Sequence, residues 1–347
     1  MKPDLLVQNL YSTALVDPIF RKTELNRLLI VSGYASSAMG FHHLNDLRDQ
    51  NKFPKIELIC GMIQTDGISR NNHEGFQSLS KSDFPDTFTC LYLGRGEPVH
   101  AKVYIWCKDD TPKIAFTGSA NYTQIALVKS QRREVLTECN PSRAFDYFKA
   151  LSSDSINCND SRIAKLFTIA LKTRTGESID SALSKNVSKL PKTQVKRSAP
   201  TTFILERNSP FFGLEKTTLS LLDKTGNVPM RSGLNWGQRP ELGRNPNQAY
   251  LAVRGDLRKL SYFPERGTYF TVLTDDDKII QCVRAQDSGK GIHTPHDNSE
   301  IGKYIRDRIG IASGAPVTAQ DLLRYGRTTI DFYKIDDENF YMDFAVR

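Results

Sequence analysis

The sequence predicts an α/β domain with a mixed sheet, followed by a mainly β domain. Three observations predict this organisation. Apolar, β-prone runs alternate with helical segments in the N-terminal half, whereas the C-terminal half holds many short β-prone runs separated by turn residues. A stretch rich in Lys, Ser and Thr, without aromatic residues, divides the two halves. A length of 347 residues also favours two domains over one.

Strand and helix signals alternate regularly in the N-terminal half. The apolar run 28–31 is typical of a buried strand and ends at Ser32. Pro141, a favoured first-turn residue, opens the last helix of this half. Further strands are predicted at 56–62, 87–93, 99–107, 113–118 and 133–139, and helices at 37–50, 72–81 and 141–151. This alternation predicts a layered α/β domain.

The dividing stretch, residues 172–200, is strongly basic. It carries seven basic and two acidic side chains, which is most of the excess behind the net charge of +8. We expect a solvated linker that can also make loose contacts with a polyanion. The predicted domains are then residues 1–171 and 201–347.

The C-terminal half is dominated by short strands. They are predicted at 202–205, 217–222, 249–254, 268–274, 278–285, 328–334 and 339–346. One amphipathic helix fits 298–309, with Glu300 in its first turn and Gly310 at its end. Many short strands with a lone helix favour a barrel or pseudobarrel. Two long polar stretches, 231–248 and 287–297, interrupt the strands.

Composition limits the compartment and the chemistry. The N-terminus lacks a basic and then apolar leader, and no apolar run approaches the length of a membrane span, so we expect a soluble, cytoplasmic protein without a membrane partner. The six cysteines show no C-x-x-C spacing, and Cys60, Cys90 and Cys107 lie in apolar runs. A zinc site or a disulfide framework is therefore disfavoured.

Two pairs of polar residues stand out between residues 99 and 121. His100 and Lys102 are two positions apart, and so are Ser119 and Asn121. Residues i and i+2 of a strand point to the same face, so two neighbouring strands would bring these four side chains to one patch. An imidazole can attack phosphorus or donate a proton, and the other groups can hold phosphoryl oxygens. Because no carboxylate cluster or Cys/His ligand set accompanies them, the pattern predicts a phosphodiesterase site without metal or cofactor.

The pattern by itself leaves a structural interpretation equally open, because H-x-K also occurs on ordinary solvated strands. Gly118 favours the catalytic interpretation, since a glycine lets the backbone approach a ligand closely. Glu134, directly before an apolar pair, would bring a carboxylate to a third strand.

The H-x-K and G-S-x-N patterns together resemble the phospholipase D superfamily motif, represented here by His100, Lys102, Gly118, Ser119 and Asn121. The superfamily usually has an Asp a few residues after the Lys, where this chain has Cys107. In the metal-independent restriction endonucleases similar to BfiI, NgoFVII and NgoAVII, a Glu downstream of the Asn joins the site, and Glu134 matches it. The resemblance implies a phospholipase D-like α/β mixed-sheet catalytic domain.

The resemblance also implies a mechanism with two histidines. One attacks phosphorus to form a phosphohistidine, and the other protonates the leaving oxygen and then activates water. Of the six histidines, only His100 has a Lys two positions on, so one motif per chain implies a homodimer that shares its site. Lys102, Asn121 and Ser119 would hold the non-bridging oxygens, and Glu134 would orient or tune the histidine. Ser32 is a lesser candidate for the rim.

The C-terminal half resembles, more loosely, the B3-like DNA-binding domain, a pseudobarrel that grips the major groove with two loop arms. Single polar loops such as 231–248 and 287–297 are usually ordinary surface loops. Arg, Asn and Gln, however, are suited to reading guanine and adenine edges. The expected DNA contacts are Arg231, Asn235, Trp236, Gln238, Arg239, Arg244, Asn245, Lys290, His293 and Thr294.

The predicted function is a type II site-specific deoxyribonuclease that acts on double-stranded DNA without a metal. A nonspecific phospholipase D-type nuclease or phosphodiesterase is the first alternative, and the polar loops count against it. A non-catalytic dimeric DNA-binding regulator is the second, and the intact His/Lys/Ser/Asn set counts against it. Some similar enzymes work with a separate helicase-like ATPase, so the resemblance also allows for that partner.

Overall fold

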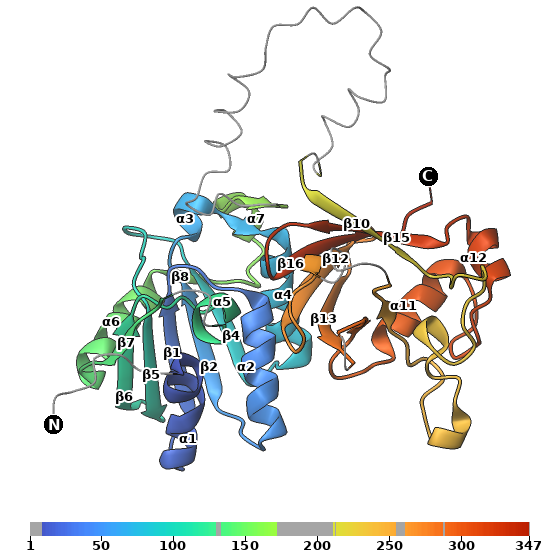
Figure 1. The fold of residues 1–347 in the computed structure, drawn as a ribbon. Helices are drawn as coiled ribbons and strands as arrows, with labels where there is room; N and C mark the ends of the chain where they lie inside the picture. Colours follow the sequence, from blue (N-terminus) through green and yellow to red (C-terminus); the bar gives the residue numbers. More distant parts are fainter. Residues whose placement is uncertain are drawn as a thin grey trace, which may run out of the picture.

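The computed structural model describes residues 9–129, 133–171, 211, 213–254, 261–286 and 289–346. These residues form two bodies side by side, each built around a seven-stranded sheet (Figure 1). The predicted linker 172–200 and the predicted strand 202–205 lie outside the described residues.

The N-terminal sheet is mixed, in the order β7-β6-β5-β1-β2-β4-β8. The central strands β1, β2 and β4 run parallel, and the flanking strands pair antiparallel. Its strands are β1 (Arg27–Ser32), β2 (Lys55–Cys60), β4 (Phe88–Leu93), β5 (Val103–Lys108), β6 (Thr111–Gly118), β7 (Leu136–Glu138) and β8 (Ser155–Asn157). The predicted mixed α/β sheet is confirmed.

Both faces of this sheet are covered, which explains why β1 is continuously apolar. Leu28 and Ile30 face a core shared with α2 (Ser37–Asp49), α4 (Arg70–Ser78) and the π-helical turn η1 (Ser12–Val16). Leu29 and Val31 face the opposite core, which is covered by α6 (Pro141–Ser153). Alternate residues of one strand thus enter two separate cores.

Several short elements surround this domain. They are α1 (Asp17–Arg21), α3 (Ile63–Asp66), η2 (Leu79–Asp83), α5 (Gln124–Leu127), α7 (Ile163–Leu166) and the small parallel pair β3 (Ile68–Ser69) and β9 (Ile169–Ala170). In the described part of the chain, no helix has the length and apolar character needed to cross a membrane.

The C-terminal sheet curves into a nearly closed barrel, because its edge strands β10 and β11 come into contact. Its order is β10-β15-β16-β12-β13-β14-β11. The strands are β10 (Glu215–Ser220), β11 (Leu251–Ala252), β12 (Tyr269–Thr274), β13 (Ile279–Ala285), β14 (Gly291–His293), β15 (Thr329–Lys334) and β16 (Asn339–Asp343). The predicted helix is α11 (Glu300–Ile309), which ends at Gly310 in the left-handed conformation.

The structure corrects three sequence expectations. The strand predicted at 99–107 begins only at Val103, so His100 and Lys102 precede β5. The stretch 287–297 contains β14, which pairs with β13 and β11 and is therefore not wholly a loop. A second helix, α12 (Ala319–Tyr325), was not predicted, because Leu322 is its one buried residue and two turns leave no apolar periodicity to detect.

The two domains are joined by buried polar contacts. The side chain of Asn71, on α4, donates to the backbone oxygens of Thr271 (3.3 Å) and Phe340 (2.9 Å). The Gln124 amide bonds both the carbonyl (2.9 Å) and the N–H (3.1 Å) of Tyr269. Figure 1 shows α4 between the two sheets. This packing brings the turn between β15 and β16 to the ends of the N-terminal strands.

Candidate active site

A cavity of about 620 Å³ opens between the ends of the N-terminal strands and the β15–β16 turn. All five residues predicted to be catalytic line it: His100, Lys102, Ser119, Asn121 and Glu134. They lie in the connections before β5, after β6 and before β7, not within the strands. The strand ends, rather than the strand faces, bring the two motif pairs together.

His100 and Lys102 contact each other directly. The Lys102 ammonium lies 3.0 Å from Nδ1 of His100 and donates to its backbone oxygen at 2.6 Å. Lys102 is 4% exposed, and burial lowers its pKa, whereas Glu134 opposes that shift. His100 is exposed at the cavity wall. Desolvation and the Lys102 ammonium lower the pKa of His100, which favours the neutral, nucleophilic imidazole at pH 7.

Ser119 and Glu134 form a hydrogen-bonded pair. The Ser119 hydroxyl donates to the Glu134 carboxylate and accepts the backbone N–H of Val135 at 3.0 Å. Gly118 makes this approach sterically feasible, because a Cβ at that position would lie 1.9 Å from the Val135 carbonyl oxygen. The glycine of G-S-x-N therefore serves the contact between β6 and β7.

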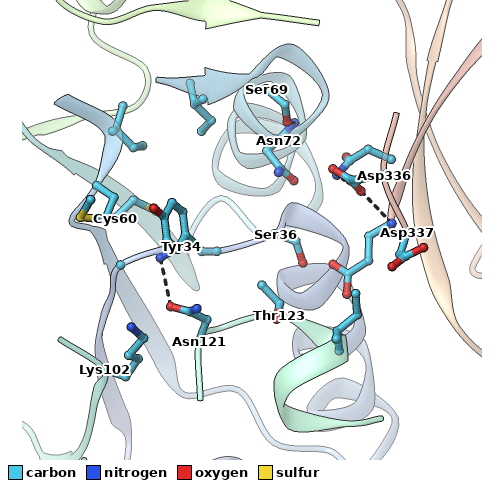
Figure 2. Close-up of a pocket in the computed structure, with 18 of the residues that line it drawn as sticks. Tyr34, Ser36, Cys60, Ser69, Asn72, Lys102, Asn121, Thr123, Asp336 and Asp337 are labelled. Atoms are coloured by element: carbon cyan, nitrogen blue, oxygen red, sulfur yellow. Dashed lines mark hydrogen bonds between the residues drawn. The ribbon is translucent and has the colours of Figure 1, made fainter. Parts of the chain in front are cut away.

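Asn121 is oriented by the loop that follows β1. Its Oδ1 accepts the backbone N–H of Tyr34 at 3.2 Å and the Ser32 hydroxyl at 3.4 Å (Figure 2). Ser32 is fully buried and also accepts the backbone N–H of Tyr122 at 3.0 Å. Ser32 is thus a support of Asn121 and not a residue of the rim.

Carboxylates form the opposite wall of the cavity. Asp336, Asp337 and Glu338, from the β15–β16 turn, line it together with the N-terminal residues. Figure 2 shows Asp336 and Asp337 on the far side from Lys102. Glu338 is buried and accepts the backbone N–H of Gln124 at 2.8 Å. Burial raises the pKa of Glu338 to about 7.

Sequence reasoning missed this wall, because the Asp-Asp-Glu run reads as an ordinary polar hairpin turn. It also missed Tyr34, whose ring lies against His100 with centroids 5.6 Å apart. Among the described residues, no group of three or more His, Cys, Asp or Glu side chains is arranged to bind a metal ion.

The predicted DNA-contacting residues of the C-terminal domain divide into two sets. Asn235 is fully buried, and its amide bonds both the N–H (2.7 Å) and the carbonyl (2.8 Å) of Val317. Gln238 donates to the backbone oxygens of Pro246 and Gly314. Asn235 and Gln238 therefore shape the 231–248 segment and offer few free groups for base reading.

His293 and Thr294 are structural in the same way. Both are buried, His293 stacks on Tyr250 and Thr294 donates to the backbone oxygen of Asp297 at 2.6 Å. The cause is β14, which places His293 inside the sheet, with Thr294 directly after it.

The second set stays at the surface. Arg231, Asn245 and Lys290 are exposed, and Arg239 is partly exposed. Arg231 pairs with Glu241 at 3.1 Å. The guanidinium of Arg244 lies over the Trp236 ring, 3.9 Å from its centroid. These side chains remain accessible to a ligand.

Comparison with known proteins agrees with the fold. Residues 8–165 match the family model described as the NgoFVII restriction endonuclease N-terminal PLD domain, and residues 211–336 match the NgoFVII C-terminal B3-like DNA-binding domain. No curated protein matches the sequence significantly.

Two solved structures show a weaker likeness. NucT from Helicobacter pylori is 16% identical, with 42% of this chain and 92% of that chain covered and a TM-score of 0.29. Polyphosphate kinase from Porphyromonas gingivalis is 12% identical, with 50% of this chain and 26% of that chain covered and a TM-score of 0.26.

The two family matches cover most of the chain in the expected order, a phospholipase D domain and then a B3-like domain. The chain belongs to the NgoFVII restriction endonuclease family and is a site-specific DNA endonuclease of the phospholipase D type.

Proposed function

We propose that this endonuclease hydrolyses DNA through a covalent phosphohistidine, without a metal, at a site completed by a second copy of the chain. The observation that carries the proposal is the arrangement around His100. An exposed imidazole of lowered pKa stands beside a buried ammonium and an oriented carboxamide in one cavity.

In the first step, an imidazole nitrogen of His100 attacks phosphorus, and the P–N bond forms as the bond to the leaving oxygen breaks. A second histidine, in its protonated form, gives its proton to that oxygen. In the second step, the same histidine takes a proton from water, the water oxygen bonds to phosphorus and the P–N bond breaks. Lys102 and Asn121 supply positive charge and N–H donors for the non-bridging oxygens.

The need for a second copy follows from the histidine count. Among the described residues that line the cavity, His100 is the one histidine. The proposed route uses a second histidine as general acid, and we infer that another chain supplies it: a two-fold interface would contribute the same residue, His100 of that copy.

We propose that the B3-like domain directs the cut through Arg231, Arg239, Arg244, Asn245 and Lys290, with Trp236 beside Arg244. Arginine forks suit guanine edges, and lysine suits phosphate. The buried Asn235, His293 and Thr294, together with the partly buried Gln238, support the segments that carry these side chains.

The test is digestion of plasmids of known sequence in excess EDTA by the wild-type chain and by His100→Gln. We expect discrete fragments from the wild type and a rate reduced by orders of magnitude in His100→Gln. A smear would favour a nonspecific nuclease, and intact plasmid with tight specific binding would favour a DNA-binding regulator.

If cleavage of plasmid needs a separate helicase-like ATPase, EDTA would stop the reaction by removing the magnesium of that partner. The wild-type chain and His100→Gln are therefore also assayed, without any partner, on bis(4-nitrophenyl) phosphate, a chromogenic phosphodiester. Full activity of His100→Gln on this substrate would exclude the phosphohistidine route.

Site sharing has its own test. Co-expression of the wild-type chain with His100→Gln gives mixed dimers in which only one of the two chains carries His100. The activity per wild-type chain should therefore fall well below that of the pure wild type. Activity that stays proportional to the amount of wild-type chain would contradict a shared site.

A further inference from the structure

We propose that Tyr34 and Asp66 form a positioning pair that holds the imidazole of His100 in place. The inference rests on the proposed function, because it assigns a role toward the nucleophile of that reaction. Neither residue belongs to the H-x-K or G-S-x-N pattern.

Tyr34 contacts two of the proposed catalytic side chains, those of His100 and Asn121. Its ring meets the His100 ring at 75°, with centroids 5.6 Å apart, and its backbone N–H orients Asn121. Its hydroxyl donates to the Asp66 carboxylate at 2.5 Å. One residue thus fixes the nucleophile by contact and the amide by a hydrogen bond, and Asp66 fixes that residue in turn.

The backbone around the pair is closely packed. A Cβ at Gly33 would lie 2.9 Å from Cδ2 of His100, so the loop passes directly against the imidazole. The backbone N–H of Met62 donates to the carbonyl of Gly33 at 3.2 Å, and the backbone N–H of Asp66 donates to the carbonyl of Met62 at 3.0 Å. The loop after β1, the helix α3 and the segment before β5 therefore hold Tyr34, Asp66 and His100 in one frame.

The charges around His100 give Asp66 a second effect. The Lys102 ammonium lowers the pKa of His100, and the Asp66 carboxylate raises it. Burial and the bond to Asp66 raise the pKa of Tyr34 to about 12, so its hydroxyl stays protonated and keeps donating at neutral pH. When His100 takes on positive charge during P–N bond formation, the nearby carboxylate stabilises it.

The first experiment measures single-turnover cleavage and DNA binding in the full chain. Tyr34→Ala removes the ring and should lower the cleavage rate about 100-fold without weakening DNA binding, the cost of a misplaced reacting group. Tyr34→Phe keeps the ring and loses only the hydrogen bond to Asp66, so its cleavage rate should fall roughly three- to tenfold. The control is Tyr147→Phe on α6, which covers the opposite face of the sheet and should change nothing.

The second experiment needs no substrate. Histidine-labelled chain is titrated by NMR, and the His100 signal is assigned by its loss in His100→Gln. Asp66→Asn keeps a hydrogen-bond acceptor for Tyr34 but removes the negative charge, so the titration midpoint of His100 should move to lower pH. The acid limb of the pH profile of the cleavage rate should move to lower pH as well.

The outcomes separate the two proposals. A fully active His100→Gln overturns the proposed function. An inactive His100→Gln together with a wild-type rate in Tyr34→Ala, or an unmoved His100 midpoint in Asp66→Asn, overturns the positioning pair alone.

Discussion

Lys102 combines two features that rarely occur together in a lysine, near-complete burial and a direct contact with a histidine. Its ammonium donates to the His100 carbonyl, and burial lowers its pKa. A buried cation costs free energy unless it is compensated. Glu134 supplies part of that compensation, and in the proposed mechanism the phosphate of the substrate supplies the rest.

Replacing Lys102 by Met should therefore affect both rate and pH dependence. Loss of the ammonium removes charge stabilisation of the phosphorane-like transition state, so cleavage should fall about 100-fold or more. The ammonium also lowers the pKa of His100, so the His100 titration midpoint should rise in Lys102→Met. Cleavage kinetics and histidine NMR measure the two effects. Lys165→Met, an exposed lysine on α7, is the control; an unchanged rate in Lys102→Met would exclude the assigned role.

At the residue scale, the motif residues could be predicted from the sequence because they form pairs at fixed short spacing. Tyr34 and Asp66 could not, since the contacts of Tyr34 with His100 and with Asp66 join positions far apart in the chain. The burial of Asn235 and Thr294 could not be predicted either, because a polar side chain in a polar stretch looks exposed until its buried partners are known.

At the scale of elements, the ends of β5, β6 and β7 set the site. The strand order places these three ends next to one another, so a four-residue shift in where β5 begins does not separate His100 from Asn121. Strong apolar runs such as 28–31 and 56–62 were predictable because burial on both faces leaves a continuous signal. The three-residue β14 gives no such signal, because it becomes a strand only through its pairing with β13.

Gly118→Ala tests the contact between β6 and β7. The added Cβ would lie 1.9 Å from the Val135 carbonyl oxygen, which is backbone and cannot swing aside. We expect a loss of stability on the order of 2 kcal/mol, seen as a lower melting temperature, together with reduced cleavage, because Ser119 and Glu134 move apart. Gly94→Ala is the matched control, since its new Cβ would meet neighbours at ordinary distances of 3.6 Å or more. Equal melting temperatures for the two variants would refute the steric argument.

At the scale of the whole molecule, the two domains meet through polar side chains that a sequence alone marks as surface. Asn71, Gln124 and Glu338 are each at most 4% exposed, and their partners lie in the other domain. Such polar contacts leave no apolar pattern in the sequence. The sequence therefore predicted two domains but not the contact between them. The contact places the carboxyl groups of Asp336, Asp337 and Glu338 at the wall of the cavity.

The buried carboxylate of Glu338 should make the stability of this arrangement depend on pH. Burial raises its pKa to about 7 from an ordinary value near 4.5, with Asp336 adding to the shift and the Ser36 hydroxyl, the Gln124 N–H and Lys129 opposing it. The folded protein then binds a proton that the unfolded chain has released, so the stability contributed by this group falls as the pH rises from about 4.5 to about 7.

Glu338→Gln removes this dependence, because the amide stays neutral and its oxygen can still accept from Gln124. The difference in melting temperature between Glu338→Gln and the wild type should therefore grow in favour of the variant between pH 5 and pH 8. The corresponding free energy is about 3 kcal/mol at most. Glu97→Gln, an exposed site, is the control and should follow the wild type at every pH. A Glu338→Gln variant whose difference from the wild type is the same at both pH values would show that Glu338 ionises in the folded protein as it does in the unfolded chain.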